Sequence, residues 1–349
     1  MMKFKKAISM LMVAVMVFAV SACGGGKPAK SEEDGKTVAN GKYKVAFILN
    51  CSINDGGWGS ACYGELVSAC EKNADWSMEY TDNLSQDGYY DAMVAYCNAG
   101  FNLIYAPGGE YTDAVLQVAN EYPDIAFAIL NGDADVPEKA ANKNVSSLLP
   151  DAKQIGWISG ALAGLMSDTG TIAFIGGMEL TTTVAKYDGY VEAAKYVAEK
   201  EGKSINVLDA VYANSFDDSS KGIEFANAMM EQNADVFFGD ASAVDSGARQ
   251  AIDKHNSEKG KVEVYDIGQP ADILGQNECV IGSQITDNSS LIELSFKAVE
   301  EGKFGGEVLY GDLQNGVLSV GKLSELVPTD KQDKYNDYIK QMKEDTFMK

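Results

Sequence analysis

The sequence predicts an α/β protein made of two lobes, each built around a parallel β-sheet. Apolar runs of strand length alternate with amphipathic stretches at helical spacing along most of the chain. The runs have no alternating polar face, so their strands should be buried on both sides, which is typical of parallel sheets flanked by helices. This alternation runs once to about Leu149 and again from about Asp151. A chain of 349 residues also exceeds the usual size of a single domain.

The expected strands are short apolar segments at residues 44–49, 103–106, 126–130, 171–175, 205–212, 235–238 and 262–265. The expected helices have apolar residues that recur every three or four positions. Those residues are Trp58, Ala61, Cys62, Leu66 and Ala69 in one helix, Ile155, Ile158, Leu162 and Leu165 in a second, and Ile223, Ala226, Met229 and Met230 in a third. Beyond residue 280 the pattern predicts a helix at 289–301 and a β-like stretch at 307–320 with a hairpin turn at Gln314-Asn315-Gly316.

The beginning of the chain has the pattern of a bacterial export signal. Three lysines precede an apolar run at 7–20, which is shorter than the roughly 20 residues of a membrane-spanning helix. Small residues then lead to Cys23 and resemble a lipobox, in which cleavage precedes an acylated cysteine; an ordinary signal peptide with an incidental Cys23 is the alternative. We therefore expect a signal peptide at 1–22 and a lipidated flexible tether at 23–41. The lipid would anchor the protein to the extracytoplasmic face of the bacterial cell membrane.

Composition excludes several classes of function. The formal net charge of −22 argues against nucleic acid and anionic membrane surfaces as partners, because a field of that sign repels both. Apart from Cys23 the chain has five cysteines, without a CxxC pair, and a single histidine, His255. A zinc site or a Ser-His or Cys-His catalytic pair is therefore nearly excluded, and buried free thiols are expected. The sequence contains neither GxGxxG nor GxxxxGK followed by Ser or Thr, so we expect no metal and no cofactor.

Ligands of parallel α/β sheets bind beyond the carboxyl ends of the strands. The predicted strands end mostly in neutral polar residues, glycines and aromatic rings. These are Asn50 with Asp55 and Trp58, Pro107-Gly108-Gly109, Asn131, Gly176-Gly177, Phe216, Asp240 to Ser242, and Asp266 to Gln269. Paired carboxylates, at Asp217 with Asp218 and at Asp133 with Asp135, are the residue type that glycosidase-like acid–base chemistry uses. Adjacent loop residues rarely converge on one bond, so solvated turn carboxylates are the preferred interpretation.

From about Lys44 to Val320 the chain resembles the basic membrane protein family of substrate-binding lipoproteins, which includes the purine nucleoside receptors of ABC importers. Each matching motif is weak alone, but their order is specific. The motifs are Asn54-Asp55-Gly56-Gly57-Trp58-Gly59, Ala99-Gly100-Phe101-Asn102-Leu103-Ile104, Tyr122-Pro123-Asp124 with Phe127, Asn144-Val145, Ile158-Ser159-Gly160-Ala161-Leu162-Ala163, Ala173-Phe174-Ile175-Gly176-Gly177, and Tyr212 with Ser215-Phe216-Asp217-Asp218.

The resemblance implies a type I periplasmic-binding-protein fold, with two Rossmann-like lobes joined by a multi-crossing hinge. We expect the first lobe at 42–147 plus 284–304 and the second at 148–283 plus 305–349. The resemblance also implies that Trp58 and Phe216, one from each lobe, clamp a purine. The alternatives are that Trp58 begins a helix and packs on its own lobe, and that Phe216 only anchors a loop. The expected ligand contacts are Asn50, Asp55, Trp58, Gly109, Asn131, Tyr187, Phe216, Asp245, Asp266, Gln269 and Ser283.

The implied function is capture of a small ligand and its delivery to an ABC permease, with no enzymatic activity. The sequence departs from the family in the polar half of the pocket: residues 282–287 lack the lysine that the family's nucleoside receptors place there. Gly59 and Gly268 also replace polar residues of the family motifs. A purine nucleoside or base is therefore the leading ligand, and a sugar-like or other small polar solute, or a role as a ligand sensor, is the alternative.

Overall fold

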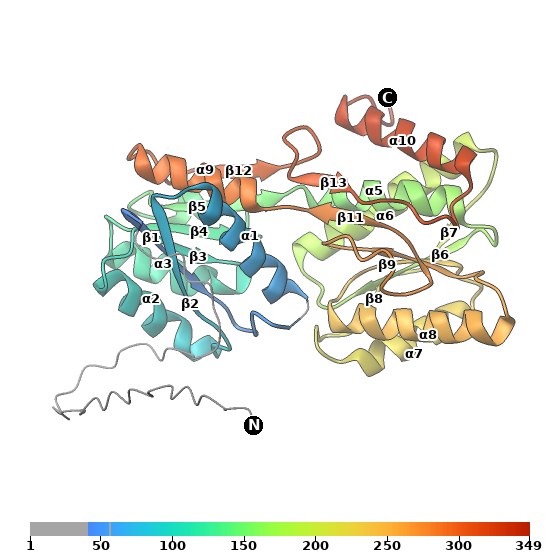
Figure 1. The fold of residues 1–349 in the computed structure, drawn as a ribbon, viewed down its shortest axis with the longest axis horizontal. Helices are drawn as coiled ribbons and strands as arrows, with labels where there is room; N and C mark the ends of the chain where they lie inside the picture. Colours follow the sequence, from blue (N-terminus) through green and yellow to red (C-terminus); the bar gives the residue numbers. More distant parts are fainter. Residues whose placement is uncertain (1–40, 56) are drawn as a thin grey trace, which may run out of the picture.

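The computed structural model describes residues 41–55 and 57–349. The expected signal peptide at 1–22, the lipidation site Cys23 and the tether up to residue 40 lie outside the described residues. Two sheets, one in each lobe, form the framework, and the lobes lie side by side (Figure 1). The strand order is β12-β5-β4-β3-β1-β2 in the first sheet and β13-β11-β10-β9-β6-β7 in the second, where β8 also pairs with β6. The predicted α/β class with two lobes and parallel sheets is confirmed.

The first sheet is parallel throughout. Its strands are β1 (Tyr43–Ile48), β2 (Trp76–Thr81), β3 (Leu103–Ala106), β4 (Ala126–Leu130), β5 (Val145–Pro150) and β12 (Val308–Gly311). Its helices are α1 (Trp58–Lys72), α2 (Tyr89–Asn98), α3 (Thr112–Glu121), α4 (Val136–Lys139) and α9 (Ser289–Glu300). Successive side chains of a strand point to opposite faces. Val45 and Phe47 of β1 accordingly pack in one core with α1 and α9, and Ala46 and Ile48 pack in another with α2 and α3.

The second sheet is parallel except for β13, which pairs antiparallel with β11. Its strands are β6 (Thr171–Gly176), β7 (Asn206–Val207), β8 (Val211–Tyr212), β9 (Val236–Asp240), β10 (Tyr265–Gly268), β11 (Val280–Thr286) and β13 (Leu318–Val320). Its helices are α5 (Ala152–Met166), α6 (Thr181–Lys200), α7 (Ser219–Met230), α8 (Ala243–Lys259) and α10 (Thr329–Lys343). Phe174 of β6 packs in one core with α5 and α6, while Ile175 packs in another with α7 and α8.

Most of the predicted strands are present to within about two residues. The segment 205–212 instead forms two separate two-residue strands, β7 and β8, and the strand predicted at 262–265 begins only at Tyr265. Strands β2, β5 and β11 were not predicted. The edge strand β2 lacks a continuous apolar run, and β5 and β11 carry serine, glycine or glutamine among their apolar residues.

Three segments of the described chain connect the lobes, and they lie along the upper side of the molecule in Figure 1. They join β5 to α5, β11 to α9, and β12 to β13. The expected boundaries assigned residues 305–349 to the second lobe, but β12 pairs with β5 of the first sheet, from Val308 opposite Ser147 to Gly311 opposite Pro150. The chain therefore returns to the first sheet and covers its β5 edge before it crosses to β13.

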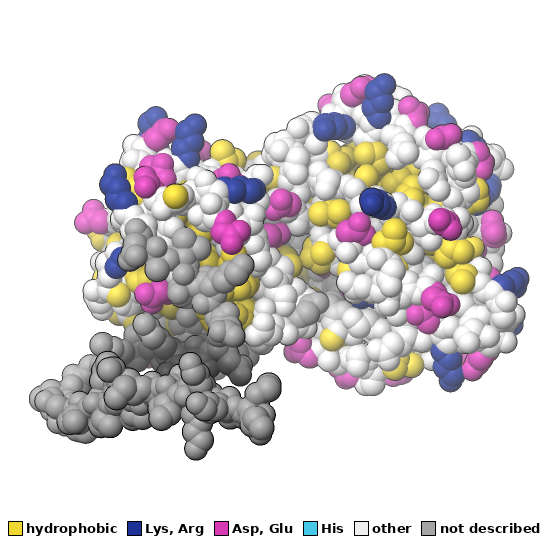
Figure 2. Space-filling view, viewed as in Figure 1, with side chains coloured by type: hydrophobic (Ala, Val, Ile, Leu, Met, Phe, Trp, Pro, Cys, Tyr) yellow, Lys and Arg dark blue, Asp and Glu magenta, His cyan; other side chains and the backbone are white. Residues whose placement is uncertain are grey.

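Acidic and basic side chains are interspersed over the face of both lobes that Figure 2 shows. Within the described residues, every helix is either too short or too polar to cross a lipid bilayer.

Candidate functional site

The loop between β1 and α1 is organised by Asp55. Its carboxylate accepts hydrogen bonds from the backbone N–H groups of Gly57 at 2.8 Å, Gly59 at 3.0 Å and Ser60 at 2.9 Å. The first turn of a helix leaves such amides without intrahelical partners, so Asp55 stabilises the start of α1. Burial raises the pKa of Asp55, but the three backbone hydrogen bonds outweigh burial and lower it below its ordinary value. Asp55 thus fixes the turn that presents Trp58.

The Trp58 side chain is half-buried against the core of its own lobe, and its indole Nε1–H donates to the Pro107 carbonyl oxygen at 2.8 Å. This bond ties the start of α1 to the turn after β3. Asn50, just past β1, is held at the same edge by two bonds. Its backbone N–H donates to the Tyr111 hydroxyl at 2.7 Å, and its side-chain amide donates to the Glu110 carboxylate at 3.0 Å.

Gly109 and Asn131 complete this edge of the first sheet. A Cβ atom on Gly109 would lie 3.1 Å from the Asn131 carbonyl oxygen, so the loops after β3 and β4 approach closely. Asn131 has a φ of 57°, a left-handed conformation that asparagine tolerates better than most residues. The structure therefore brings the predicted first-lobe residues together at the carboxyl edge of the sheet. They are Asn50, Asp55, Trp58, Gly109 and Asn131.

Three loops of the second lobe are joined around Phe216. The N–H of Gly177 donates to the Asp240 carbonyl oxygen at 2.9 Å, the N–H of Ser215 to the Gly177 carbonyl oxygen at 3.1 Å, and the N–H of Ala243 to the Phe216 carbonyl oxygen at 2.9 Å. The Phe216 ring lies directly over Gly177, where a Cβ atom would meet ring carbons at 2.4 Å. The glycine therefore allows the half-buried ring to pack closely against the loop that follows β6.

The two edges approach each other. A Cβ atom on Gly57, the residue before Trp58, would lie 3.7 Å from the Cβ of Ser242 in the second lobe. Burial raises the pKa of the Cys51 thiol to about 12, with further contributions from the carboxylates of Asp55 in its own lobe and Asp217 in the other. At neutral pH Cys51 is therefore protonated and a poor nucleophile. The loop that carries Trp58 thus faces the loops that carry Phe216.

A polar cluster that sequence reasoning missed lies at the carboxyl edge of the second sheet. The Lys186 ammonium group on α6 donates to Asp240 Oδ1 at 2.8 Å and to Gln269 Oε1 at 3.2 Å. The Gln269 amide donates to Asp240 Oδ1 at 3.1 Å and to the Gly239 carbonyl oxygen, and the Thr183 hydroxyl donates to Asp240 Oδ2 at 2.7 Å. Burial raises the pKa of Asp240, but the Lys186 charge and these hydrogen bonds outweigh burial and lower it. Of this cluster, only Gln269 was a predicted contact.

Tyr187 and Ser283, two other predicted contacts, have partners inside the second lobe. The Tyr187 hydroxyl donates to the Leu208 carbonyl oxygen at 3.1 Å, and the ring packs on the core that α6 covers. The buried Ser283 hydroxyl accepts the N–H of Ile273 at 3.1 Å and so supports the loop after β10. That Tyr187 and Ser283 contact the ligand stays a prediction, and the hydrogen bonds that they make inside the lobe do not support it.

Asp245 and Asp266 belong to a buried charge network around Arg249. Asp266 is only 4% exposed and pairs with the Arg249 guanidinium at 3.2 Å, while Asp245 accepts the N–H of Ala241 at 2.8 Å. Burial raises the pKa of Asp245 to about 7 and of Asp266 to about 6, against the opposing attraction of Arg249. The network fixes the start of α8 against β9 and β10, and ligand contact by these two carboxyl groups also stays a prediction.

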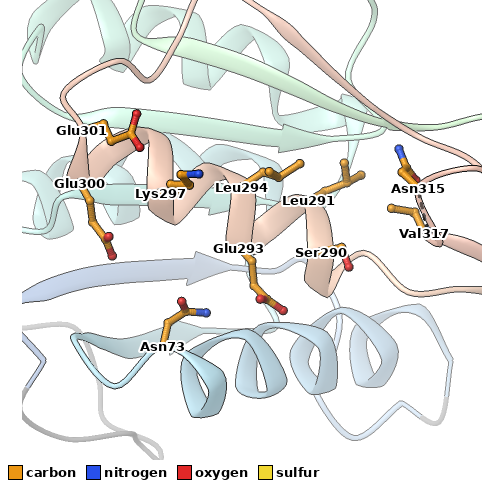
Figure 3. A pocket seen from close by; sticks show the side chains of 10 residues that line it. All are labelled: Asn73, Ser290, Leu291, Glu293, Leu294, Lys297, Glu300, Glu301, Asn315 and Val317. Atoms are coloured by element: carbon orange, nitrogen blue, oxygen red, sulfur yellow. Dashed lines mark hydrogen bonds between the residues drawn. The ribbon is translucent and has the colours of Figure 1, made fainter.

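A hollow of about 700 Å³ lies on a different part of the surface, around α9 (Figure 3). It is bounded by α9, the end of α1 and the connection between β12 and β13. Its lining residues are Asn73, Ser290, Leu291, Glu293, Leu294, Lys297, Glu300, Glu301, Asn315 and Val317. None of the predicted ligand contacts lines it, so it is separate from the edges that carry Trp58 and Phe216.

The facing edges provide two aromatic rings, amide groups and carboxylates, which are suited to stacking and hydrogen bonding. Among residues 41–55 and 57–349, no group of three or more His, Cys, Asp and Glu side chains is placed to hold a metal ion. The cysteines in that part of the chain are free thiols, namely Cys51, Cys62, Cys70, Cys97 and Cys279.

Comparison with known proteins agrees with this architecture. Residues 42–346 match a family model described as "Bmp: ABC transporter substrate-binding protein PnrA-like". The chain is 28% identical to "Transcriptional activator protein med" of Bacillus subtilis over 88% of its own length and 90% of that protein. It is 24% identical to "Uncharacterized lipoprotein PH1714" of Pyrococcus horikoshii over 98% of its own length and 86% of that protein.

A crystal structure of an ABC transporter solute-binding protein from Aeropyrum pernix is similar in fold. The TM-score is 0.71 with 18% sequence identity, over 87% of this chain and 92% of that one. Together with the match over 42–346, this similarity confirms the resemblance seen in the motifs. The chain therefore belongs to the Bmp family of PnrA-like substrate-binding proteins of ABC transporters.

Proposed function

We propose that this protein is a lipid-anchored extracytoplasmic receptor that captures a purine nucleoside or base between its lobes and delivers it to an ABC import permease. The observation that carries the proposal is the placement of the two rings. Trp58 follows Gly57, which approaches Ser242, and the neighbouring Ala243 is hydrogen-bonded to Phe216. A flat ligand at this junction would have one aromatic ring available from each lobe.

The polar groups around the rings support a nitrogen heterocycle as the ligand. The Asn50 side-chain amide and the Glu110 carboxylate lie at the same sheet edge as Trp58, and Gln269 with Asp240 forms a polar group in the second lobe. A purine edge carries both donors and acceptors, so it would pair with such groups while its faces stack. Stacking on aromatic side chains contributes about 1–3 kcal/mol per base in nucleic-acid readers.

The proposed mechanism is closure of the two lobes around the ligand. A ligand that contacts both edges stabilises the closed arrangement more than the open one, and its differential affinity sets the extent of closure. The closed form would then be the one that the permease recognises. Binding of this kind requires no covalent step, and we propose that the protein has no enzymatic activity.

A second candidate function is ligand sensing. The observation that favours it is the 28% identity, over nearly the full length of both chains, to a protein named as a transcriptional activator. A sensor would use the same closure but pass the signal to a regulatory partner instead of a permease. A sugar-like or other small polar solute is the alternative ligand class in either case.

Calorimetric titration tests the ligand class. Purified protein should bind at least one of adenosine, guanosine, inosine or their bases with about micromolar or better affinity, and the ligand should be recovered unchanged after long incubation. Heat from a sugar or an amino acid, with no response to any purine, would contradict the purine proposal. Conversion of the bound purine into a product would contradict a function limited to binding.

A further inference from the structure

The segment that joins β11 to α9 reaches the first lobe at a carboxyl group of α1. Asn288 lies at the end of that segment, directly before α9. Its backbone N–H donates to Glu65 Oε1 at 3.1 Å, and its side-chain amide donates to both Glu65 oxygens at 3.1 Å. These bonds form a hinge contact between Glu65 and Asn288. The contact ties one of the three connecting segments to the helix that begins with Trp58.

The hinge contact is coupled to a second connecting segment. The N–H of Asp287 donates to the Val317 carbonyl oxygen at 2.8 Å, and Val317 lies between β12 and β13. The N–H of Ser289 donates to Asp287 Oδ1 at 2.9 Å, so the residues on both sides of Asn288 are held together. Connecting segments of this kind absorb the backbone changes when two lobes open and close. A change at Glu65 can therefore alter how easily the lobes move.

Two buried polar atoms near Glu65 lack a hydrogen-bond partner among residues 41–55 and 57–349. They are the Tyr105 hydroxyl of β3 and Oδ1 of Asn288, and both residues are only 1% exposed. The Glu65 charge acts on Tyr105, so the three side chains belong to one polar group under α1. An ionised carboxylate can only accept hydrogen bonds, whereas a neutral carboxyl group also donates one. A neutral Glu65 thus has a donor for these atoms that the ionised form lacks.

An ionised Glu65 has no cation paired with it in the described part of the chain. Lys72, two turns further along α1, directs its ammonium group to the Glu293 carboxylate of α9 at 2.9 Å and to the Ser289 hydroxyl at 3.3 Å. Asp287 in the connecting segment adds a second negative charge that acts on Glu65. The charges around Glu65 therefore favour its neutral form.

The other titratable neighbours of Glu65 are neutral. Burial raises the pKa of the Cys62 thiol on the same helix and of the Tyr105 hydroxyl on β3 well above their ordinary values. Burial and the Asp287 charge raise the pKa of Glu65 to about 7, and the hydrogen bonds from Asn288 oppose this increase without cancelling it. The neutral form therefore stabilises the hinge contact fully below pH 4.5, the ordinary pKa of the group, and this stabilisation is lost as pH rises through 7.

We propose that Glu65 is a proton switch in the hinge: its neutral carboxyl group holds the connecting segment against α1, and its ionisation loosens that segment and weakens ligand capture. This inference rests on the lobe closure of the proposed function and not on a purine as the ligand. An uncompensated charge is stabilised by water, and more water reaches Glu65 when the segment and α1 separate. A looser hinge lowers the population of the closed arrangement and with it the apparent affinity. The competing explanation is that Glu65 only fixes the start of α9.

Hydrogen–deuterium exchange of the unliganded full chain in detergent measures the hinge contact directly. Residues 286–292 include the backbone N–H groups of the contact. Their exchange, corrected for the intrinsic effect of pH on amides, should rise about 10- to 50-fold between pH 5 and pH 8. The reason is that the pKa of Glu65 falls from about 7 toward 4.5 when the contact opens, so ionisation favours opening. An unchanged corrected rate would overturn the inference without any variant being made.

Two variants assign the effect. Glu65→Gln keeps a neutral side chain of similar shape, so exchange at residues 286–292 should lose most of its rise with pH. Glu293→Gln removes the carboxylate that pairs with Lys72 on the same side of α9 and should retain the rise. The same rise in folded Glu65→Gln would show that another group titrates, and would overturn the inference.

Calorimetric titration tests the link to ligand capture. The probes are adenosine, guanosine, ribose and glucose, which carry no group that titrates between pH 5 and pH 8. Any probe that binds should bind about 3- to 10-fold more weakly at pH 8 than at pH 5, and Glu65→Gln should remove most of this difference. An affinity independent of pH, alongside pH-dependent exchange, would confine Glu65 to a local role and overturn the inference.

Failure of the purine proposal gives a different pattern. If a sugar binds and neither nucleoside does, the purine proposal is wrong, and the affinity of the sugar at the two pH values decides the switch. If no probe binds, the purine proposal is again wrong, and exchange at residues 286–292 in the unaltered protein and in Glu65→Gln decides the switch.

Discussion

Removal of the Trp58 ring separates a stacking role from a packing role. Trp58→Ala should weaken ligand binding by about 1–3 kcal/mol, or roughly 5- to 150-fold, because one face of the stack is lost. The structure also predicts a moderate loss of stability. Replacing a fully buried tryptophan by alanine lowers the free energy of unfolding by about 3–5 kcal/mol. Trp58 is only half-buried, so about 2 kcal/mol is expected, including about 1 kcal/mol for the indole hydrogen bond to Pro107 at 2.8 Å.

Two further variants sharpen this experiment. Trp58→Phe keeps an aromatic face but loses the indole hydrogen bond, so it should lose about 1 kcal/mol of stability and retain most of the affinity. Trp157→Phe is the matched control. Trp157 lies on α5, is also half-buried, and its indole N–H donates to the Glu192 carboxylate on α6 at 3.0 Å. It should lose stability without losing affinity.

The assays are calorimetric titration with the best-binding purine and urea unfolding of the unliganded protein. The reasoning would be refuted if Trp58→Ala bound the ligand within twofold of the unaltered protein while losing 3–5 kcal/mol of stability. That result would assign the ring to the core of its own lobe. It would also remove the main support for a flat ligand.

Three other predictions concern separate parts of the chain. Asp55→Ala should lower the free energy of unfolding by about 1–2 kcal/mol, as expected for loss of a helix cap. Asp55→Asn should retain most of the stability of the unaltered protein. Equal stability of the two variants in urea unfolding would contradict the capping role. Burial raises the pKa of Glu65 from about 4.5 to about 7, despite hydrogen bonds from Asn288, so the folded state keeps a proton that the unfolded chain has lost. The free energy of unfolding should therefore fall by up to about 3 kcal/mol as pH rises from 4.5 to 7. Glu65→Gln should make the free energy of unfolding depend less steeply on pH over this range. An unchanged pH dependence in the variant would exclude Glu65 as its source. Cys23→Ser should yield a precursor or a released protein in membrane fractionation, because acyl chains supply the attachment, whereas a processed variant that stays on the membrane would rule out lipidation.

Much of the fold could be predicted from sequence because buried parallel strands leave a simple signal. The runs that became β3 and β4 are apolar at every position, and each is buried throughout. The edge strand β2 has half-exposed residues and no such run, so local pattern did not distinguish it from a loop. The return of β12 to the first sheet depends on pairing with β5, more than 150 residues away, which no local pattern records.

The candidate site was predicted in part for a similar reason. Residues that directly follow strands, such as Asn50 and Asn131, were expected at the sheet edge because topology alone takes them there. Lys186 was missed because on sequence it is an ordinary charged residue of an amphipathic helix. Only the packing of α6 on the sheet brings it to Asp240, 54 residues away. The internal partners of Asp266 and Ser283 could not be predicted either, because Arg249 and Ile273 are specified by tertiary contacts.

The central claim is that the two lobes enclose a purine. Mass spectrometry of the small molecules released when the protein, as purified from cells, is denatured tests it most directly. We predict recovery of a purine nucleoside, in an amount comparable to the protein, with less recovered from folded Trp58→Ala. Recovery of a solute without an aromatic ring in that amount, undiminished in Trp58→Ala, would contradict the claim.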